Sequence, residues 1–253
     1  MKSKLFAAAA LVVIVSASGA YAKPDANQIA AVADKARPEA DIKRDEVRKP
    51  ADMLEFAGVK PGQTVVDLLP GGGYFTRIFS KAVGPKGTVY SVSGPPRPMT
   101  DPAKPPAPPA QDVIAADPSY ANVKPVHAPL QNGLSVPTQA DLVWTSQNYH
   151  DFKNIPNVDM LAFDKTIFNA LKPGGVFIVL DHVANPDTVD ATKTVHRIDP
   201  AVVKKEAEAA GFKFEGESKA LANPADDHKG RSTDDGPLRG RTDQFIYKFR
   251  KPK

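Results

Sequence analysis

Runs of apolar, mostly β-branched residues alternate along the chain with segments in which apolar residues recur every three or four positions. The first pattern predicts β-strands, and the second predicts helices that pack one face against a sheet. Phe75, Ile78, Phe79 and Ala82 form such a helical face between the first two runs. A helix between consecutive strands requires a crossover connection, so these strands are expected to pair in parallel. Strands are predicted at residues 64–67, 87–93, 122–126, 141–145 and 176–181.

The C-terminal part of the chain continues this alternation and then changes it. Further helices are predicted from Pro50 to Gly58, over residues 156–171, and from Asp199 to Gly211. A sixth strand begins at Phe212, and residues 244–250 alternate between apolar and polar positions, as in an antiparallel pair at a sheet edge. The order of elements therefore predicts an α/β fold. Its sheet is expected to be Rossmann-like, doubly wound and seven-stranded, mostly parallel with an antiparallel C-terminal edge hairpin.

The beginning of the chain has the pattern of an export signal. Residues 1–22 combine Lys2 and Lys4, an apolar run over residues 5–15 and small residues ending at Ala22. These are the features of a cleaved signal peptide, so we expect cleavage after Ala22 and a periplasmic or secreted location. A retained N-terminal anchor is the alternative. Residues 23–49 predict a helical extension, and residues 50–253 predict the main domain.

A proline-rich segment interrupts the main domain at residues 94–110. It contains eight prolines, which exclude a helix or a central strand and predict an extended surface insertion. The insertion follows the end of a parallel strand, where folds of this kind bind ligands, so it could form part of a lid. A proline-rich ligand for a partner domain is the alternative.

Composition removes several classes of function. The chain has no cysteine, which excludes disulfides, thiol catalysis, cysteine-ligated metal and a lipid-attachment cysteine. Loss of residues 1–22 removes two lysines and no acids, so the net charge of +4 becomes +2. Basic residues are scattered among acids, which argues against a nucleic-acid partner. We expect a small-molecule substrate and no membrane association after signal cleavage, and the oligomeric state is not predicted.

The stretch TVVDLLPGGGYFTR, residues 64–77, predicts a strand, a tight glycine loop and a helix in direct succession. Glycine adopts positive φ without steric penalty and lets a ligand approach the backbone closely. The loop would therefore present backbone amides beside a helix N-terminus, where an anionic group can bind. A tight turn with no ligand is the alternative.

Three stretches together resemble the class I S-adenosylmethionine (SAM)-dependent methyltransferases. They are VVDLLPGGGYFTRIF from residue 65, NYHD at 148–151 and ALKPGGVFIVLDH at 170–182. The segments HRID at 196–199, NPADD at 223–227 and RTDQFIYKFRKP at 241–252 resemble, more narrowly, a group of exported bacterial predicted methyltransferases. The resemblance covers residues 50–253 and implies transfer of a methyl group from SAM to a small-molecule acceptor. A non-catalytic binding protein that kept this fold is the alternative.

The resemblance also implies which residues hold SAM. Asp67 would reach the donor's ammonium group or cap the glycine turn, and Ser93 stands where the family has an acid for the ribose. The family's first loop glycine is replaced by Leu69. The full set of donor-binding candidates is Asp67, Pro70, Gly71, Gly72, Gly73, Tyr74, Ser93, His127, Ala128 and Asn148.

Polar residues that follow the fourth and fifth predicted strands are the candidates for catalysis. His150 would act as the base that takes the acceptor's proton, and Asp151 would orient its imidazole or cap the next helix. Tyr149 would pack on cofactor or substrate, or lie in the core as an ordinary aromatic residue. Metal-dependent chemistry is a further alternative, because some O-methyltransferases of this fold hold a metal there. His150, Asp151, Asp181 and His182 could hold Mn, Fe or Zn, although we expect no metal.

Overall fold

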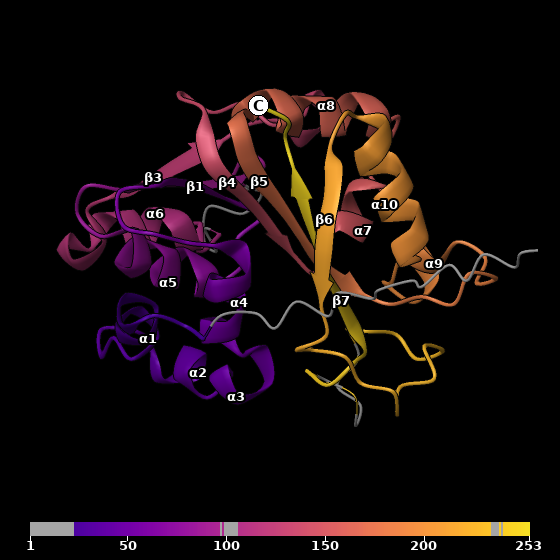
Figure 1. The fold of residues 1–253 in the computed structure, drawn as a ribbon, viewed down its shortest axis with the longest axis horizontal. Coiled ribbons are helices and arrows are strands. Elements are labelled where there is room, and N and C mark those ends of the chain that lie inside the picture. The colour runs from indigo at the N-terminus through magenta and orange to yellow at the C-terminus, as the bar shows by residue number, and fades with distance from the viewer. Residues whose placement is uncertain (1–22, 97, 99–105, 234–237, 239) are drawn as a thin grey trace, which may run out of the picture.

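The computed structural model describes residues 23–96, 98, 106–233, 238 and 240–253. Its centre is one seven-stranded sheet in the order β3-β2-β1-β4-β5-β7-β6 (Figure 1). Six strands run in the same direction, and β7 runs antiparallel between β5 and β6. The predicted fold class is confirmed. The strands are β1 (Thr64–Leu68), β2 (Thr88–Ser93), β3 (Val123–His127), β4 (Ala140–Ser146), β5 (Leu171–His182), β6 (Lys213–Ser218) and β7 (Gln244–Arg250).

Helices cover both faces of the sheet, and each face has its own apolar core (Figure 1). Neighbouring strand residues Val65 and Val66 point into opposite cores, as the period of two in a strand requires. One face carries α1 (Ala26–Val32), α4 (Pro50–Ala57), α5 (Tyr74–Val83) and α6 (Ala110–Ala116), and the other carries α7 (Tyr149–Phe152), α8 (Met160–Ala170) and α10 (Pro200–Ala209). The short helices α2 (Glu39–Ile42), α3 (Asp45–Arg48) and α9 (Ala191–Thr194) complete the α-helices in the described residues, which also contain the 3-10 helices η1 (Pro118–Tyr120) and η2 (Leu130–Asn132).

The strand order reverses between β1 and β4, which places a crevice at their carboxyl ends. β2 and β3 extend to one side of β1, whereas β5 extends beyond β4 on the other. The loops after β1 and β4 therefore leave the sheet in opposite directions. This is the position at which open α/β sheets bind their ligands.

The larger differences from the prediction are two element boundaries and one missed helix. The helix predicted at 156–171 begins at Met160, because Asn157 has a positive φ of 58° and Asp159 caps the helix by accepting from the Ala162 amide. Strand β5 begins at Leu171, before the glycines that were expected to precede it. The helix α6 was not predicted, because the prolines before Ala110 obscured its start.

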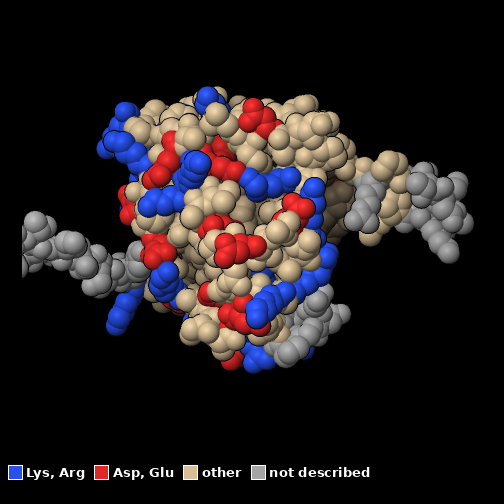
Figure 2. Space-filling view, turned by 90° about the vertical axis from the view of Figure 1, so that its right-hand side faces the viewer, with Lys and Arg blue, Asp and Glu red and all other residues tan. Residues whose placement is uncertain are grey.

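Two predicted segments fall wholly or partly outside the described residues. The predicted signal peptide, residues 1–22, lies outside them, so that prediction is not tested. Residues 94–96, 98 and 106–109 of the proline-rich insertion are described and contain no helix or strand. None of the helices among the described residues has the length and apolar character needed to cross a bilayer. Figure 2 shows acidic and basic side chains interspersed over one face of the molecule.

Candidate functional site

Two adjoining cavities lie at the carboxyl ends of the parallel strands. The smaller, of about 170 Å³, is bordered by Asp67 and by the loop residues Leu69 to Gly72. The larger, of about 670 Å³, is bordered by His150 and other polar side chains. Arg44, Arg48 and Gln147 border both cavities, so the two form one continuous region.

The glycine loop after β1 has the conformation that the sequence predicts. Gly71 and Gly73 have positive φ values of 56° and 79°, and Leu69, in the place of the family's first glycine, also has a positive φ of 57°. A side chain in this conformation is strained by roughly 1–2 kcal/mol. Space for a Cβ is open at Gly71, whereas one at Gly73 would lie 2.1 Å from Ile114 of α6. Gly71 therefore leaves room at the cavity, and Gly73 lets α6 pack against the loop.

Asp67 lies at the floor of the smaller cavity and is almost fully buried. Its Oδ2 accepts a hydrogen bond from Thr76 Oγ1 at 2.6 Å, so it ties β1 to the first turn of α5. Burial raises the pKa of Asp67 to about 6, against the opposing effects of the Thr76 hydrogen bond and the Arg48 charge. A buried carboxylate of this kind favours a cationic group placed beside it.

The N-terminal extension supplies an arginine that sequence reasoning missed. Arg48 stacks over the rings of Tyr74 and Phe75, at 4.6 Å and 4.9 Å from their centroids, and donates to Ser146 Oγ at 2.9 Å. Burial, followed by the positive charge of Arg44, lowers the pKa of Arg48 to about 10. The only signal in the sequence was the spacing of two arginines four positions apart, which places them on one helical face.

Tyr74 borders the smaller cavity and also contacts the N-terminal extension. Its hydroxyl donates to Asp45 Oδ1 at 2.6 Å, and its ring supports Arg48. Together with the Arg37–Asp45 ion pair, this contact fixes the extension against the glycine loop. Tyr74 therefore acts on the smaller cavity through Arg48 as well as by bordering it.

His150 is held by a buried carboxylate at the end of β5. Asp181 Oδ1 lies 2.8 Å from His150 Nδ1, and Asp181 Oδ2 accepts from the His150 backbone amide at 2.9 Å. Burial lowers the pKa of His150, but the charge and hydrogen bond of Asp181 outweigh it, so the pKa is raised. Because Asp181 accepts the Nδ1 proton, the lone pair of the neutral ring lies on Nε2, and the side chain borders the larger cavity.

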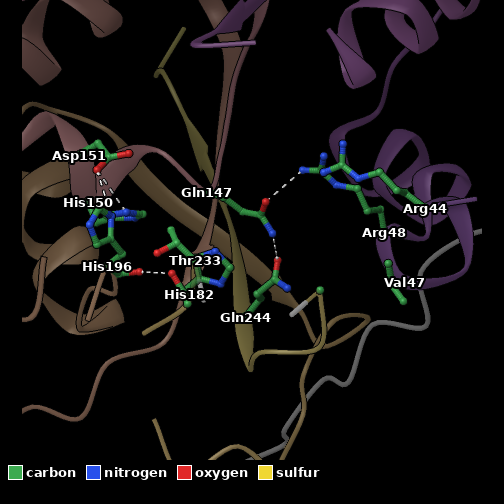
Figure 3. A pocket seen from close by; sticks show the side chains of 12 residues that line it. Arg44, Val47, Arg48, Gln147, His150, Asp151, His182, His196, Thr233 and Gln244 are labelled. Carbon is green, nitrogen blue, oxygen red and sulfur yellow. Dashed lines mark hydrogen bonds and ion pairs between the residues drawn. The ribbon is translucent and has the colours of Figure 1, made fainter. Parts of the chain in front are cut away.

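Asp151 has neither of the two roles expected for it. Asp181 orients the His150 imidazole, and Asp159 caps α8. The Oδ1 atom of Asp151 instead lies 3.3 Å from His150 Nε2 and 3.6 Å from His196 Nδ1. Figure 3 shows these side chains on one side of the larger cavity, with Arg44 and Arg48 opposite.

The two further histidines at the larger cavity differ in their surroundings. His182 Nδ1 and Thr242 Oγ1 form a hydrogen bond of 2.7 Å. Burial lowers the pKa of His182 to about 4, so this histidine is neutral at physiological pH. His196 has a positive φ of 51°, and burial and the charge of Arg231 lower its pKa. The four residues that the sequence suggested as metal ligands therefore do not all point toward one position. His150 and Asp151 converge with His196, whereas Asp181 is committed to His150.

Tyr149 and Asn148 have structural contacts. Tyr149 is fully buried on the core side of α7, and its hydroxyl donates to Asp164 Oδ2 at 2.7 Å. The expectation that Tyr149 packs on cofactor or substrate is thus not met, and the ordinary core aromatic describes it. Asn148 Nδ2 donates to the backbone oxygens of Leu69 and Ser146, so it joins the loops that follow β1 and β4 while bordering the smaller cavity.

A polar cluster lies at the ends of β2 and β3, where the resemblance places the ribose and adenine. Gln111 of α6 contacts the hydroxyl of Ser93, and Asp112 Oδ1 lies 2.8 Å from His127 Nε2. The Ala128 amide donates to the Ser93 oxygen in the backbone ladder. The acid missing from the end of β2 is therefore present nearby, on a helix that the sequence did not reveal.

Comparison with solved structures defines the class of fold. The chain is similar to a SAM-dependent methyltransferase from Aquifex aeolicus, with a TM-score of 0.56 and 17% identity, over 82% of this chain and 98% of that chain. It is also similar to 1,6-didemethyltoxoflavin-N1-methyltransferase from Burkholderia thailandensis, whose structure holds 1,6-didemethyltoxoflavin and S-adenosylhomocysteine. That match has a TM-score of 0.54 and 15% identity, over 85% of this chain and 82% of that chain. No protein-family model and no curated protein matches the chain. The chain has the Rossmann-like fold of the class I methyltransferases.

Proposed function

We propose that this protein transfers a methyl group from SAM to a small-molecule acceptor. The observation that carries the proposal is the pair of adjoining cavities at the reversal of strand order, one bordered by the glycine loop and one by histidines. Methyl transfer is a one-step displacement, so its rate depends on holding donor and acceptor in line. Two connected cavities with different linings provide such an arrangement.

The smaller cavity suits the amino-acid end of SAM. The open space at Gly71 would admit the donor close to the backbone, and the buried Asp67 would attract its ammonium group. Arg48, from the opposite side, would pair with its carboxylate. The residues present thus match both charges of the donor's amino-acid end.

The ribose end of the donor would use residues from α6. Ser93 and Gln111 offer hydrogen-bonding groups at the end of β2, and Asp112 offers the carboxylate that β2 lacks. We therefore assign recognition of the ribose hydroxyls to Ser93, Gln111 and Asp112, with His127 and Ala128 toward the adenine. This assignment favours a donor-binding protein over a binding protein that has lost the donor.

The larger cavity would hold the acceptor. We assign activation of the acceptor to His150, because Asp181 fixes its ring and leaves the Nε2 lone pair for the acceptor side. The basic and polar lining favours a small polar acceptor. An exported, periplasmic location and membership of the exported bacterial methyltransferase group belong to the same proposal, motivated by residues 1–22 and by the segments HRID and NPADD.

Replacing Gly71 by valine tests the donor site. Valine would place a branched side chain in the open space at the smaller cavity, so SAM affinity is expected to fall at least about tenfold. Isothermal titration calorimetry with SAM and with S-adenosylhomocysteine measures this. Gly62→Val is the matched control, because Gly62 also has positive φ and open space at Cβ but lies in the turn before β1.

This control distinguishes the effect of backbone strain from steric blockage of the donor site. Gly62→Val carries a similar backbone strain and is expected to leave donor affinity unchanged within about twofold. The absence of heat at about millimolar SAM with the unaltered protein would overturn the enzyme proposal and favour a protein that binds a different ligand.

A further inference from the structure

We propose that His150, Asp151 and His196 form a binding site for a divalent transition metal at the edge of the larger cavity. One ligand atom from each of these residues lies within 4.8 Å of the other two. The set differs from the one that the sequence suggested, because His196 replaces Asp181 and His182. The inference deepens the acceptor half of the proposed function, but metal binding itself does not depend on SAM.

His150 is prepared to donate an electron pair. Its ring is only 2% exposed, and among the described residues Nε2 has no hydrogen-bond partner, although Asp151 Oδ1 lies 3.3 Å away without hydrogen-bond geometry. Asp181 holds Nδ1 at 2.8 Å from its Oδ1 atom and is itself fixed by the backbone amides of His150 and His182. A carboxylate behind the far nitrogen is the usual support of a metal-bound histidine, since it fixes the tautomer and orients the ring. Leaving a buried ring nitrogen unpaired is otherwise unfavourable.

The spacing of the ligand atoms suits a single ion. Asp151 Oδ1 lies 3.3 Å from His150 Nε2 and 3.6 Å from His196 Nδ1 (Figure 3). Two ligands about 2.1 Å from a metal in a tetrahedral arrangement lie roughly 3.4 Å apart. Both separations measured from Asp151 are therefore close to this value, and the two imidazole ligand atoms lie within 4.8 Å of each other.

The type of ligand selects the type of metal. Two imidazoles with one carboxylate favour Zn²⁺, Fe²⁺ or Mn²⁺ over Ca²⁺ and Mg²⁺, which prefer oxygen ligands. Three protein ligands leave coordination positions for an exogenous group, as in catalytic rather than structural sites. Because the three residues border the larger cavity or meet at its edge, an oxygen of the acceptor could take such a position. With Nε2 bound to the metal, His150 would no longer take the acceptor's proton. The metal would instead lower the pKa of a bound acceptor hydroxyl, so that solvent water takes its proton.

One contact competes with the metal. Arg231 Nη2 lies 2.5 Å from His196 Nε2, and because arginine only donates, the His196 proton is then on Nδ1. Metal binding at Nδ1 requires this proton to move to Nε2 and Arg231 to turn away. Arg231 is exposed at the surface, and turning away would also break its hydrogen bonds to Thr233 Oγ1 and the Thr194 backbone oxygen. Arg231 thus opposes metal binding, so its replacement is expected to raise the affinity for metal.

Metal titration of the untagged protein tests the site. Isothermal titration calorimetry with Zn²⁺, and the visible absorption of bound Co²⁺, are expected to show one ion per chain. His196→Ala and Asp151→Ala are each expected to weaken binding at least about tenfold, whereas Arg231→Ala strengthens it several-fold. His228→Ala is the matched control, because His228 also neighbours a carboxylate, Asp243, but does not border the larger cavity. It is expected to bind as the unaltered protein does.

His150→Ala is a poorer test on its own, because it leaves the buried Asp181 carboxylate without its ring partner and destabilises the fold. His196 and Asp151 are more exposed, so their replacement leaves the fold intact. Equal metal affinity in all variants, or loss of affinity in His228→Ala alone, would overturn the site. Failure to bind metal with unchanged SAM binding would overturn this inference and leave the proposed function standing.

Discussion

Replacing Arg197 by methionine is expected to lower the free energy of unfolding by about 3–5 kcal/mol. Arg197 forms a bidentate ion pair with Asp226, with N–O distances of 2.8 Å and 3.2 Å, and both side chains are fully buried. The guanidinium also donates to the backbone oxygens of Val183 and Gly230. Methionine would leave the Asp226 charge buried without its counter-ion. Urea denaturation at neutral pH measures the loss.

Two further variants show whether burial is the cause. Lys172→Met breaks the partly exposed ion pair with Asp141 and is expected to change stability by no more than about 1 kcal/mol. Arg197→Met combined with Asp226→Leu is expected to recover part of the loss, because no charge then remains buried. Recovery is incomplete, since Asp226 also accepts from the amides of His228 and Asp243. A loss below about 1 kcal/mol for Arg197→Met would contradict the role of this pair in fixing the loop beside His196.

Replacing Asp67 by asparagine is expected to stabilise the fold and to weaken SAM binding. Folding raises the pKa of Asp67 from 3.8 to about 6, mainly through burial, so the folded state disfavours the ionised form. The contribution of this carboxyl to stability is therefore fully present below about pH 4 and is lost as the pH rises through about 6. At about pH 8 the variant should be more stable by on the order of 2 kcal/mol, because asparagine carries no charge and can still accept from Thr76.

The pH dependence and the donor affinity check this prediction together. The stability difference between Asp67→Asn and the unaltered protein is expected to shrink toward zero as the pH falls to about 4. Asp187→Asn, at an exposed position, is the control and should change stability by no more than about 0.5 kcal/mol. SAM affinity of the Asp67 variant should fall at least about tenfold, because a neutral amide does not attract the ammonium group. Unchanged affinity would remove Asp67 from the donor site, and a loss of stability at about pH 8 would contradict its buried charge.

The sequence predicted the part of the site whose residues lie close together in the chain. Asp67, Gly71 and Gly73 belong to one strand, loop and helix, and their conformation follows from short-range rules about β-branched residues and glycine. His150 was placed correctly at the end of β4 for the same reason. Tyr149, its direct neighbour, was not, because adjacent residues of the short helix α7 point in different directions and Tyr149 enters the core.

Other parts of the site depend on contacts between residues far apart in the chain. The bond between Arg48 and Ser146 joins positions 98 residues apart, and the approach of Asp151 to His196 joins α7 to the loop after α9. Leu69 is a third example. Leucine replaces the family's glycine at this position, but the backbone keeps a positive φ. Local propensity disfavours that conformation, so the surrounding packing must enforce it.

The sequence alone therefore determined the order of the strands along the chain, the parallel sheet and the glycine loop beside Asp67, because hydrophobic period and turn chemistry act over a few residues. Only the tertiary structure decided that Arg48 faces this loop, that α6 brings Asp112 to the end of β3, and that His196 rather than His182 meets His150 and Asp151. Those pairings depend on how the loops at the crevice pack. Their free energy comes from burial and charge across distant segments, which no local pattern records.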